Sequence, residues 1–173
     1  EKLLNDYGVE LINTWGMTEA LAGSKGSLRP GDGDLPPEQR LDKLTKSGRG
    51  LFGIRHRIVD DEGEELPWDG ENRGHLQIKG PWIASGYFKD EGGTPLNEEG
   101  WLTTGDVAII EPDGYLTLQD RSKDVIKSGG EWISSVEIEN LAVGHPDILQ
   151  AAVIGIAHSK WQERPLLICE RRP

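Results

Sequence analysis

Short runs of alternating apolar and polar residues dominate the middle of the chain. Four of these runs, at residues 53–60, 75–80, 101–110 and 115–120, are separated by turn segments rich in Gly, Asp and Pro. Runs of this length and period, bounded by such residues, predict β-strands, and the Asp-Gly pair at 113–114 is a strong hairpin signal. The middle segment therefore predicts a small antiparallel β-barrel or a distorted antiparallel sheet.

The pattern before this segment is mixed. Residues 1–7 have apolar positions at helical spacing and are followed by Gly8, so they predict the last turns of a helix. Residues 9–15 are mainly apolar and predict a buried strand. Residues 22–48 are rich in Gly, Pro and charge, which predicts a long surface connection with a short helix near residues 38–44.

The pattern changes again after Arg121. Residues 125–134 predict a second hairpin, and residues 134–144 predict a helix with a serine cap. Residues 150–157 and 165–170 predict two strands joined by a charged loop. The order of these elements is that of a βαβ-like start of an α+β unit.

A domain boundary is expected at residues 121–124, where a strand ends in charged residues. It divides the chain into residues 1–121 and residues 122–173. The predicted fold class is α+β, with a small antiparallel β-barrel or distorted sheet followed by the start of a small α+β domain.

Composition narrows the class of protein. The 173 residues carry a formal net charge of −11, and this argues against a nucleic-acid partner because such binding depends on clustered cations. Cys169 is the sole cysteine, so an internal disulfide and a multi-cysteine metal site are excluded, which suits a reducing compartment. No apolar run approaches a membrane span, and the first residues lack the pattern of a secretion signal. We expect a soluble, cytoplasmic protein.

The stretch NTWGMTEA, residues 13–20, is the first candidate site. Trp15 offers a flat stacking surface beside the hydroxyl of Thr18 and the carboxylate of Glu19, and Gly16 would let a ligand approach the backbone closely. A glutamate beside a phosphate can serve as an oxygen ligand for magnesium. These residues suit a nucleotide and a metal, but a plain turn capped by Thr18 explains them as well.

The second and third candidate sites lie further along the chain. Asp106, at the end of an apolar run, could accept hydrogen bonds from the vicinal hydroxyls of a ribose, and Arg121 could add a second grip. Lys123 and Lys127 sit near the expected boundary, and the glycines at 129–130 permit a tight turn. Taken singly, Asp106 is explained equally by a turn and the two lysines by solvated surface charges.

The order and spacing of five motifs change this balance. Together they resemble the AMP-forming adenylating enzyme superfamily, which includes acyl-CoA synthetases, luciferase and peptide-synthetase adenylation domains. The resemblance covers essentially the whole chain and is strongest to fatty-acyl and short-chain acyl-CoA ligases, among them methylmercaptopropionate-CoA ligase. The motifs are NTWGMTE (13–19), GPWIASGYF (80–88), GWLTTGD (100–106), DRSKDVIKSGGEWISSVEIEN (120–140) and HPDILQAAVIGIAHSKWQERP (145–165).

The resemblance implies a reaction in two halves. A carboxylic acid attacks the α-phosphate of ATP to give acyl-AMP and pyrophosphate, and the thiol of coenzyme A then displaces AMP to give the thioester. The implied cofactors and substrates are ATP, which leaves as AMP, Mg²⁺, coenzyme A and a fatty or other carboxylic acid.

The resemblance also assigns residues to the adenylation half. Trp15 takes the place of a tyrosine that usually lies against adenine. Thr18 would contact the phosphate, and Glu19 would help to hold magnesium. Asp106 and Arg121 would bind the ribose hydroxyls.

For the thioester half, the resemblance assigns a hinge and a loop. Lys123 matches the hinge on which the small C-terminal domain swings between the two half-reactions. Lys127 is a further catalytic candidate, and Glu131 and Trp132 would stand near the pantetheine tunnel and the acyl group. The residues that match the loop meeting the pantetheine arm are Ser128, Gly129 and Gly130.

Parts of the family pattern are missing from these 173 residues. A phosphate-binding loop is expected upstream of residue 1 and a catalytic lysine downstream of Pro173, so the chain is expected to be an inactive C-terminal fragment of a ligase. Two alternatives stay open. One is an adenylation domain that loads a carrier protein, and the other is a non-catalytic β-rich interaction module.

Overall fold

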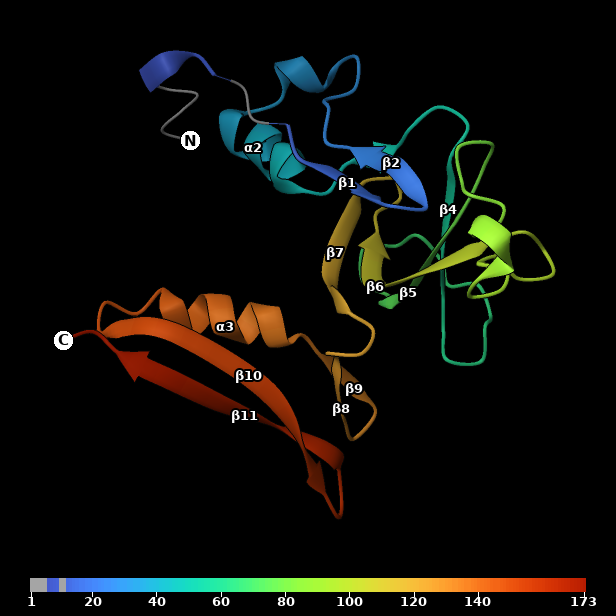
Figure 1. Ribbon diagram of the computed structural model, residues 1–173. Coiled ribbons are helices and arrows are strands. Elements are labelled where there is room, and N and C mark those ends of the chain that lie inside the picture. Colours follow the sequence, from blue (N-terminus) through green and yellow to red (C-terminus); the bar gives the residue numbers. More distant parts are fainter. Residues whose placement is uncertain (1–5, 10–11) are drawn as a thin grey trace. The chain divides into compact units, whose positions relative to one another are not determined.

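The computed structural model describes residues 6–9 and 12–173 (Figure 1). The chain divides into two compact units, each made of two segments. Unit 1 consists of residues 1–104 and 108–118, and unit 2 consists of residues 105–107 and 119–173. No helix in the described part of the chain is long and apolar enough to cross a membrane.

A three-stranded sheet lies at the start of unit 1. It contains β1 (Thr14–Met17), β2 (Ala20–Lys25) and the short β3 (Arg49–Gly50), in that order and all antiparallel. The buried strand expected at residues 9–15 is wrong in its bounds, because β1 begins only at Thr14 and its residues alternate between exposed and half-buried. Residues 10–11 of that expectation lie outside the described residues. Of the helix expected at residues 1–7, Asp6 and Tyr7 are helical and residues 1–5 lie outside the described part.

The second sheet of unit 1 contains the four strands expected in the middle of the chain, and all four are confirmed. The sheet has the order β4-β5-β6-β7. Within the described residues it is an open sheet, so it corresponds to the expected distorted sheet and not to a closed barrel. Apolar side chains that alternate along these strands, such as Ile58, Leu76 and Ile78, are fully buried and form the core. The strands are β4 (Arg55–Val59), β5 (Gly74–Lys79), β6 (Leu102–Ile110) and β7 (Leu116–Arg121).

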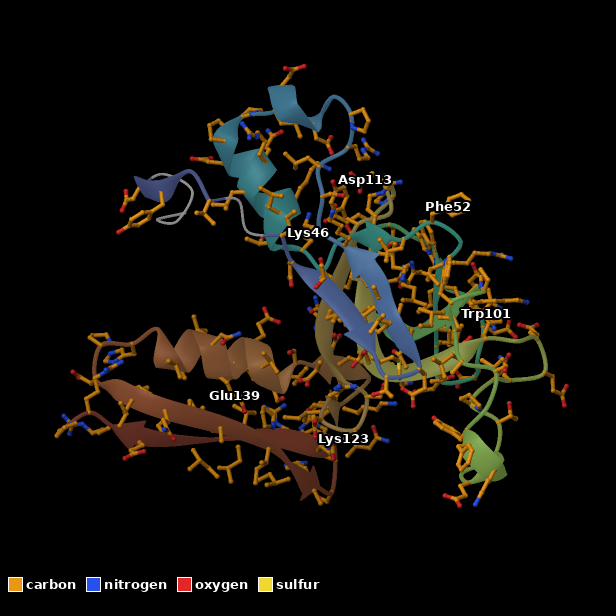
Figure 2. The ribbon with its side chains drawn as sticks, turned by 45° about the horizontal axis from the view of Figure 1, so that its top comes forward. Lys46, Phe52, Trp101, Asp113, Lys123 and Glu139 are labelled. Carbon is orange, nitrogen blue, oxygen red and sulfur yellow. The ribbon has the colours of Figure 1, made fainter. Side chains whose placement is uncertain are left out.

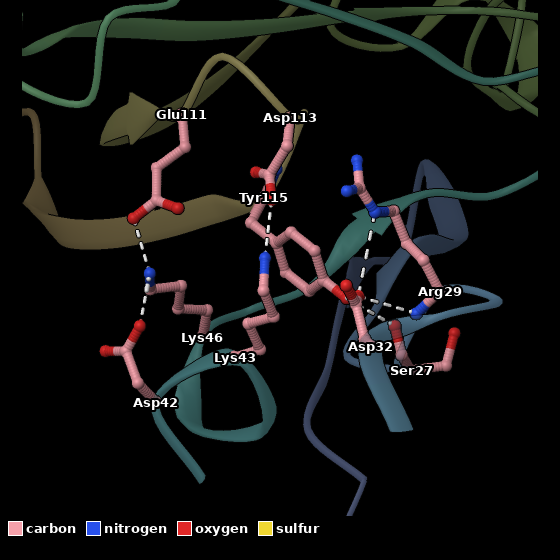
Figure 3. Close-up of polar contacts among 9 residues, drawn as sticks. All are labelled: Ser27, Arg29, Asp32, Asp42, Lys43, Lys46, Glu111, Asp113 and Tyr115. Atoms are coloured by element: carbon pink, nitrogen blue, oxygen red, sulfur yellow. Dashed lines mark hydrogen bonds and ion pairs between the residues drawn. The ribbon is translucent and has the colours of Figure 1, made fainter. Parts of the chain in front are cut away.

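The helix expected near residues 38–44 is present as α2 (Pro37–Thr45), with a proline at its start. Ion pairs join its C-terminal end to the turn between β6 and β7 (Figure 3). Lys43 Nζ lies 2.5 Å from Asp113 Oδ2, and Lys46 pairs with Glu111. Both lysine side chains are mostly buried, so their aliphatic stems contribute packing in addition to the charge of the ammonium groups.

The connection before α2 is also tied to the β6–β7 turn. The fully buried Tyr115 donates its hydroxyl to the Ser27 carbonyl at 2.8 Å, and Asp32 Oδ2 lies 3.2 Å from the same hydroxyl (Figure 3). The backbone N–H of Arg29 donates to Asp32 at 2.8 Å and lowers the pKa of that carboxyl. The segment before α2, which the sequence predicts to be a surface connection, is therefore anchored by the buried Tyr115.

Unit 2 contains the expected hairpin, helix and strand pair. A four-stranded sheet has the order β10-β11-β8-β9, and its strands pair antiparallel. The βαβ-like order of elements is present, but without the parallel pairing that a crossover βαβ unit would show. The elements are β8 (Ile126–Ser128), β9 (Glu131–Ile133), α3 (Ser135–Val143), β10 (Ile148–His158) and β11 (Gln162–Arg171).

Helix α3 lies along the β10–β11 hairpin (Figure 1). Its N-cap is Ser134, whose side chain accepts a hydrogen bond from the Glu137 N–H at 3.2 Å, as the serine-cap prediction requires. Glu139, labelled in Figure 2, accepts the Val153 N–H at 2.8 Å and so joins the helix to β10.

Candidate functional site

The motif at residues 13–20 forms a hairpin within unit 1. Thr18 and Glu19 occupy the two-residue turn between β1 and β2, where Met17 pairs with Ala20. The register shifts between Trp15 and Met17, so the strand is irregular at Gly16. A Cβ at Gly16 would lie 2.6 Å from the Leu21 carbonyl oxygen. The close approach of the neighbouring strand therefore requires a glycine here, independently of any ligand.

Trp15 is packed on one side. A Cβ at Gly23 would lie 2.1 Å from an indole carbon of Trp15, so the ring covers this glycine of the partner strand. The ring centroid lies 6.4 Å from that of His56, with the two planes tilted by 57°. Burial lowers the pKa of His56 to about 4, although its hydrogen bond with the Gly23 backbone acts in the opposite direction. The imidazole beside Trp15 is therefore neutral at neutral pH.

Glu19 is held by the segment that carries the motif at residues 80–88. Its carbonyl oxygen accepts the Ala84 N–H at 2.8 Å, and its Oε1 accepts the hydroxyl of Tyr87 at 2.7 Å. This hydrogen bond, with smaller contributions from burial and from the carboxylate charge, raises the pKa of Tyr87. The sequence motif contains Tyr87 but does not reveal it as a partner of Glu19, because the two residues are 68 positions apart.

The described residues contain no group of three or more side chains that could hold a metal ion by themselves. Magnesium in nucleotide sites is commonly held by one or two carboxylates together with the substrate phosphates. A lone, half-buried Glu19 in a tight turn, with one carboxylate oxygen held by Tyr87, fits this second kind of site.

In unit 2 the two residues expected at the ribose are in contact. Arg121 Nη1 lies 2.9 Å from Asp106 Oδ1. The Asp106 side chain is only 8% exposed, whereas that of Arg121 is 61% exposed. The Ser122 N–H donates to the Gly105 carbonyl at 2.8 Å and fixes the two chain segments beside each other. The pair therefore presents a buried carboxylate next to a solvent-facing guanidinium.

The segment around Lys123 is a tight turn. The N–H groups of Asp124 and Val125 both donate to the Arg121 carbonyl, at 2.9 and 3.1 Å. Just before it, Asp120 Oδ2 accepts the N–H and the hydroxyl of Ser135, at 2.7 and 2.8 Å. A carboxylate at the start of α3 interacts favourably with the helix dipole. The sequence predicted a serine cap here but gave no sign of this aspartate.

The glycine loop is the turn of the β8–β9 hairpin. Gly129 and Gly130 have φ values of +63° and +92°, the left-handed conformations that a two-residue hairpin turn of this type requires. Ser128 is buried, and Glu131 is exposed. The structure thus places the expected loop residues side by side on one hairpin.

Lys127 and Trp132 face each other across that hairpin. They are paired in the strand register, and Lys127 Nζ lies 4.7 Å from the Trp132 ring centroid, within the range of a cation–π contact. The two candidates therefore interact with each other in this structure.

An open hollow of about 550 Å³ lies in unit 2 beside the turn at Lys123. Its walls include Arg121 and Lys123 from the turn, Glu139 from α3 and Val153 from β10. The lining combines charged groups of both signs with apolar side chains, and this suits a ligand with polar and apolar parts.

Comparison with known proteins agrees with the resemblance in the motifs. The family model of the AMP-binding enzymes matches residues 1–88. The chain is 48% identical over 168 residues to the medium-chain-fatty-acid–CoA ligase of Ectopseudomonas oleovorans, covering 96% of this chain and 31% of that protein. It is 49% identical over 165 residues to the 3-methylmercaptopropionyl-CoA ligase of Ruegeria lacuscaerulensis, covering 94% of this chain and 30% of that protein.

Among solved structures, o-succinylbenzoate CoA synthetase from Bacillus subtilis, in complex with its acyl-adenylate intermediate, is similar to this chain. The TM-score is 0.79 and the identity 28%, covering 99% of this chain and 34% of that structure. The chain thus spans about a third of the length of these relatives. From the matched half of the sequence, the ordered motifs and the shared fold, we conclude that the chain belongs to the AMP-binding enzyme family.

Proposed function

We propose that the chain is part of an AMP-forming acyl-CoA ligase that activates a carboxylic acid with ATP and transfers the acyl group to coenzyme A. The observation that carries the proposal is the contact between Asp106 and Arg121 at 2.9 Å, since their motifs are separate in the sequence and both are assigned to one ribose. Support comes also from the relatives, whose names are those of CoA ligases for medium-chain fatty acids and for 3-methylmercaptopropionate.

In the adenylation half-reaction, a carboxylate oxygen of the acid forms a bond to the α-phosphorus of ATP, and the bond to pyrophosphate breaks. We assign Trp15 to the adenine face, Asp106 and Arg121 to the ribose hydroxyls, and Thr18 to the phosphates. Glu19 would hold magnesium, which when bound neutralises phosphate charge. Positioning and charge neutralisation account for most of the catalysis of such transfers, so a few fixed side chains are sufficient.

In the thioester half-reaction, the sulfur of coenzyme A attacks the acyl carbonyl carbon, and AMP leaves with the electron pair of the broken bond. We assign the loop at residues 128–130 to the pantetheine arm, with Lys127, Glu131 and Trp132 around it. Two glycines leave the loop without side chains at the point where a thin chain must pass.

The two half-reactions need different groups at one site, so we propose a pivot at Lys123. This places a domain boundary between residues 121 and 122, with the sheet of β4–β7 on the large-domain side. A pivot requires a few residues at the end of an element that can change their backbone angles, and a tight turn directly after β7 meets that requirement.

The test uses the complete polypeptide that includes these residues. We expect release of pyrophosphate from ATP that depends on added fatty acid, followed by formation of acyl-CoA. Asp106→Ala should cost about 2–3 kcal/mol in kcat/KM for ATP, or roughly 30- to 150-fold, because a charged hydrogen-bond acceptor is lost. Glu98→Ala, which removes an exposed acid from another turn, is the matched control and should leave this value unchanged.

Three outcomes would contradict the proposal. An unchanged ATP dependence in Asp106→Ala would refute the ribose assignment. Transfer to a phosphopantetheinyl carrier protein and not to coenzyme A would replace the ligase by a carrier-loading enzyme, and absence of acid-dependent pyrophosphate release would favour a non-catalytic module. For the 173-residue chain alone, we expect ATP with magnesium to bind more weakly than about 1 mM by calorimetry, because a few isolated contacts give little affinity.

A further inference from the structure

The tip of the β10–β11 hairpin lies directly on the glycine loop of unit 2. Gln162 at the start of β11 pairs with Ser128 at the end of β8. The Gly129 N–H donates to the Trp161 carbonyl at 3.0 Å. A Cβ at Gly129 would lie 2.6 Å from a ring carbon of Trp161, so the indole rests on this glycine. The motif KWQERP, at residues 160–165, thus has a physical role that the proposed function does not use.

The backbone of the hairpin tip is strained at this contact. Gln162 has a φ of +67°, which residues with a side chain rarely adopt. The Glu163 N–H donates to the Trp161 carbonyl at 2.8 Å, which closes a three-residue γ-turn centred on Gln162. The Trp161 carbonyl therefore accepts two N–H groups, one from its own turn and one from Gly129. Strain that persists in a folded protein is often associated with a functional geometry.

A second contact holds the strand before the loop. The Lys127 N–H donates to Glu163 Oε2 at 3.0 Å. The carboxylate of Glu163 and the carbonyl of Trp161 thus bind two backbone N–H groups that flank Ser128. We call residues 161–163 the tip clamp.

Gly129 and Gly130 differ in a way that separates the clamp from ordinary turn chemistry. Both have positive φ, so both would be strained by any side chain. Only Gly129 has the Trp161 ring against its Cα, because no described atom lies within 4 Å of a Cβ built on Gly130. The turn type alone explains the glycine at 130. At position 129 the Trp161 ring also leaves no room for a side chain.

From these contacts we infer that Trp161 and Glu163 are positioning residues for the thioester half-reaction, holding the loop backbone in the shape that admits the pantetheine arm, with no part in adenylate formation. The inference rests on the proposed function of the loop. The strained turn at Gln162 then has a function, because it keeps the Trp161 carbonyl directed at the Gly129 N–H while β11 continues from Gln162.

The first experiment tests the contact itself in the 173-residue chain. Urea denaturation is measured for Gly129→Ala and Gly130→Ala, each with Trp161 intact and with Trp161→Ala. We expect Gly129→Ala to destabilise more than Gly130→Ala when the ring is present, and the two to become equal when it is removed. Equal destabilisation in both backgrounds would show that the ring does not rest on Gly129.

The second experiment separates the half-reactions in the complete ligase. We expect Trp161→Ala to lower kcat/KM for coenzyme A about tenfold or more, with the rate of acid-dependent pyrophosphate release in the absence of coenzyme A within twofold of wild type. Trp161→Phe should recover most of the loss because it restores a ring over the glycine. Glu163→Gln keeps an acceptor for Lys127 N–H and should be milder than Glu163→Leu.

The matched control is Trp68→Ala, because Trp68 is 42% exposed and Trp161 38% exposed, and Trp68 lies in unit 1. It should change neither half-reaction. Equal loss of both half-reactions in Trp161→Ala, or a kcat/KM for coenzyme A within twofold of wild type, would overturn the inference while leaving the ligase proposal intact. A wild-type protein that releases no pyrophosphate would refute the ligase proposal itself, and the role of the clamp with it.

Discussion

Protonation of His56 provides a sharp test of the packing around Trp15. The imidazole lies on β4 beside the Trp15 indole and is half-buried. Its Nε2 atom is buried without a hydrogen-bond partner among the described residues. Burial disfavours the charged form and lowers the pKa from 6.5 to about 4, against the opposing effect of the hydrogen bond with the Gly23 backbone.

The sign and size of the effect follow from linkage. The unfolded chain binds a proton at His56 with a pKa near 6.5, whereas the folded chain does so only near 4. Stability is therefore complete above pH 6.5 and falls as the pH drops toward 4, because the proton favours the unfolded state. Between pH 7 and pH 5, proton binding at His56 lowers the free energy of unfolding by the equivalent of about 1.4 pKa units, or about 2 kcal/mol.

The assay has two parts. NMR titration of the imidazole ring proton should give a midpoint near 4 for His56. Urea denaturation at pH 7 and pH 5 should show that the wild type loses about 2 kcal/mol more than His56→Phe, which keeps a ring but cannot titrate. The comparison uses only the change with pH, since the substitution also removes the bond to Gly23. A midpoint of 6.5 or above, or the same loss in both proteins, would refute the reasoning.

Three further predictions concern Lys123, Gly48 and Asp113. Lys123→Pro should suppress thioester formation more than adenylate formation, since proline at this turn position restricts the preceding residue, and equal loss of both rates would contradict the hinge assignment. Gly48→Ala should cost about 3 kcal/mol or more in urea denaturation, because φ is +89° and the new Cβ would lie 1.9 Å from the Lys25 carbonyl carbon. Asp113→Asn should cost about 1 kcal/mol at pH 7 by removing the pair with Lys43. Burial raises the pKa of Asp113, but the bond from Lys43 and weaker attractions outweigh it and leave the pKa below 3.8, so the difference from wild type should shrink as the pH falls below that value.

Local chemistry accounts for the elements that could be predicted. The four strands of the central sheet follow from period-two alternation, and the β8–β9 turn follows from two adjacent glycines. Helix α3 begins where a serine can cap it. The strand expected at residues 9–15 was wrong in its bounds, because an apolar run does not reveal which of its residues find a strand partner.

The candidate site also contains residues that the sequence predicted and one that it did not. The ordered motifs predict that Asp106 and Arg121 act on the same ribose, and the structure places the two side chains in contact. Tyr87 was missed as the partner of Glu19, although its motif was recognised. A tyrosine in a Gly-rich loop carries no local signal of a carboxylate 68 residues away.

By itself, the sequence identified the family, predicted the order of the elements from β4 to β11, and supplied the residues that we propose for nucleotide and coenzyme A. These features depend on residue type and short spacing, which act over a few positions. Only the tertiary structure decided that Trp161 rests on Gly129, that Tyr87 holds Glu19 and that His56 loses its charge beside Trp15. Such contacts form when distant segments exclude water from each other, and that exclusion depends on the whole packed fold rather than on any short stretch of chain.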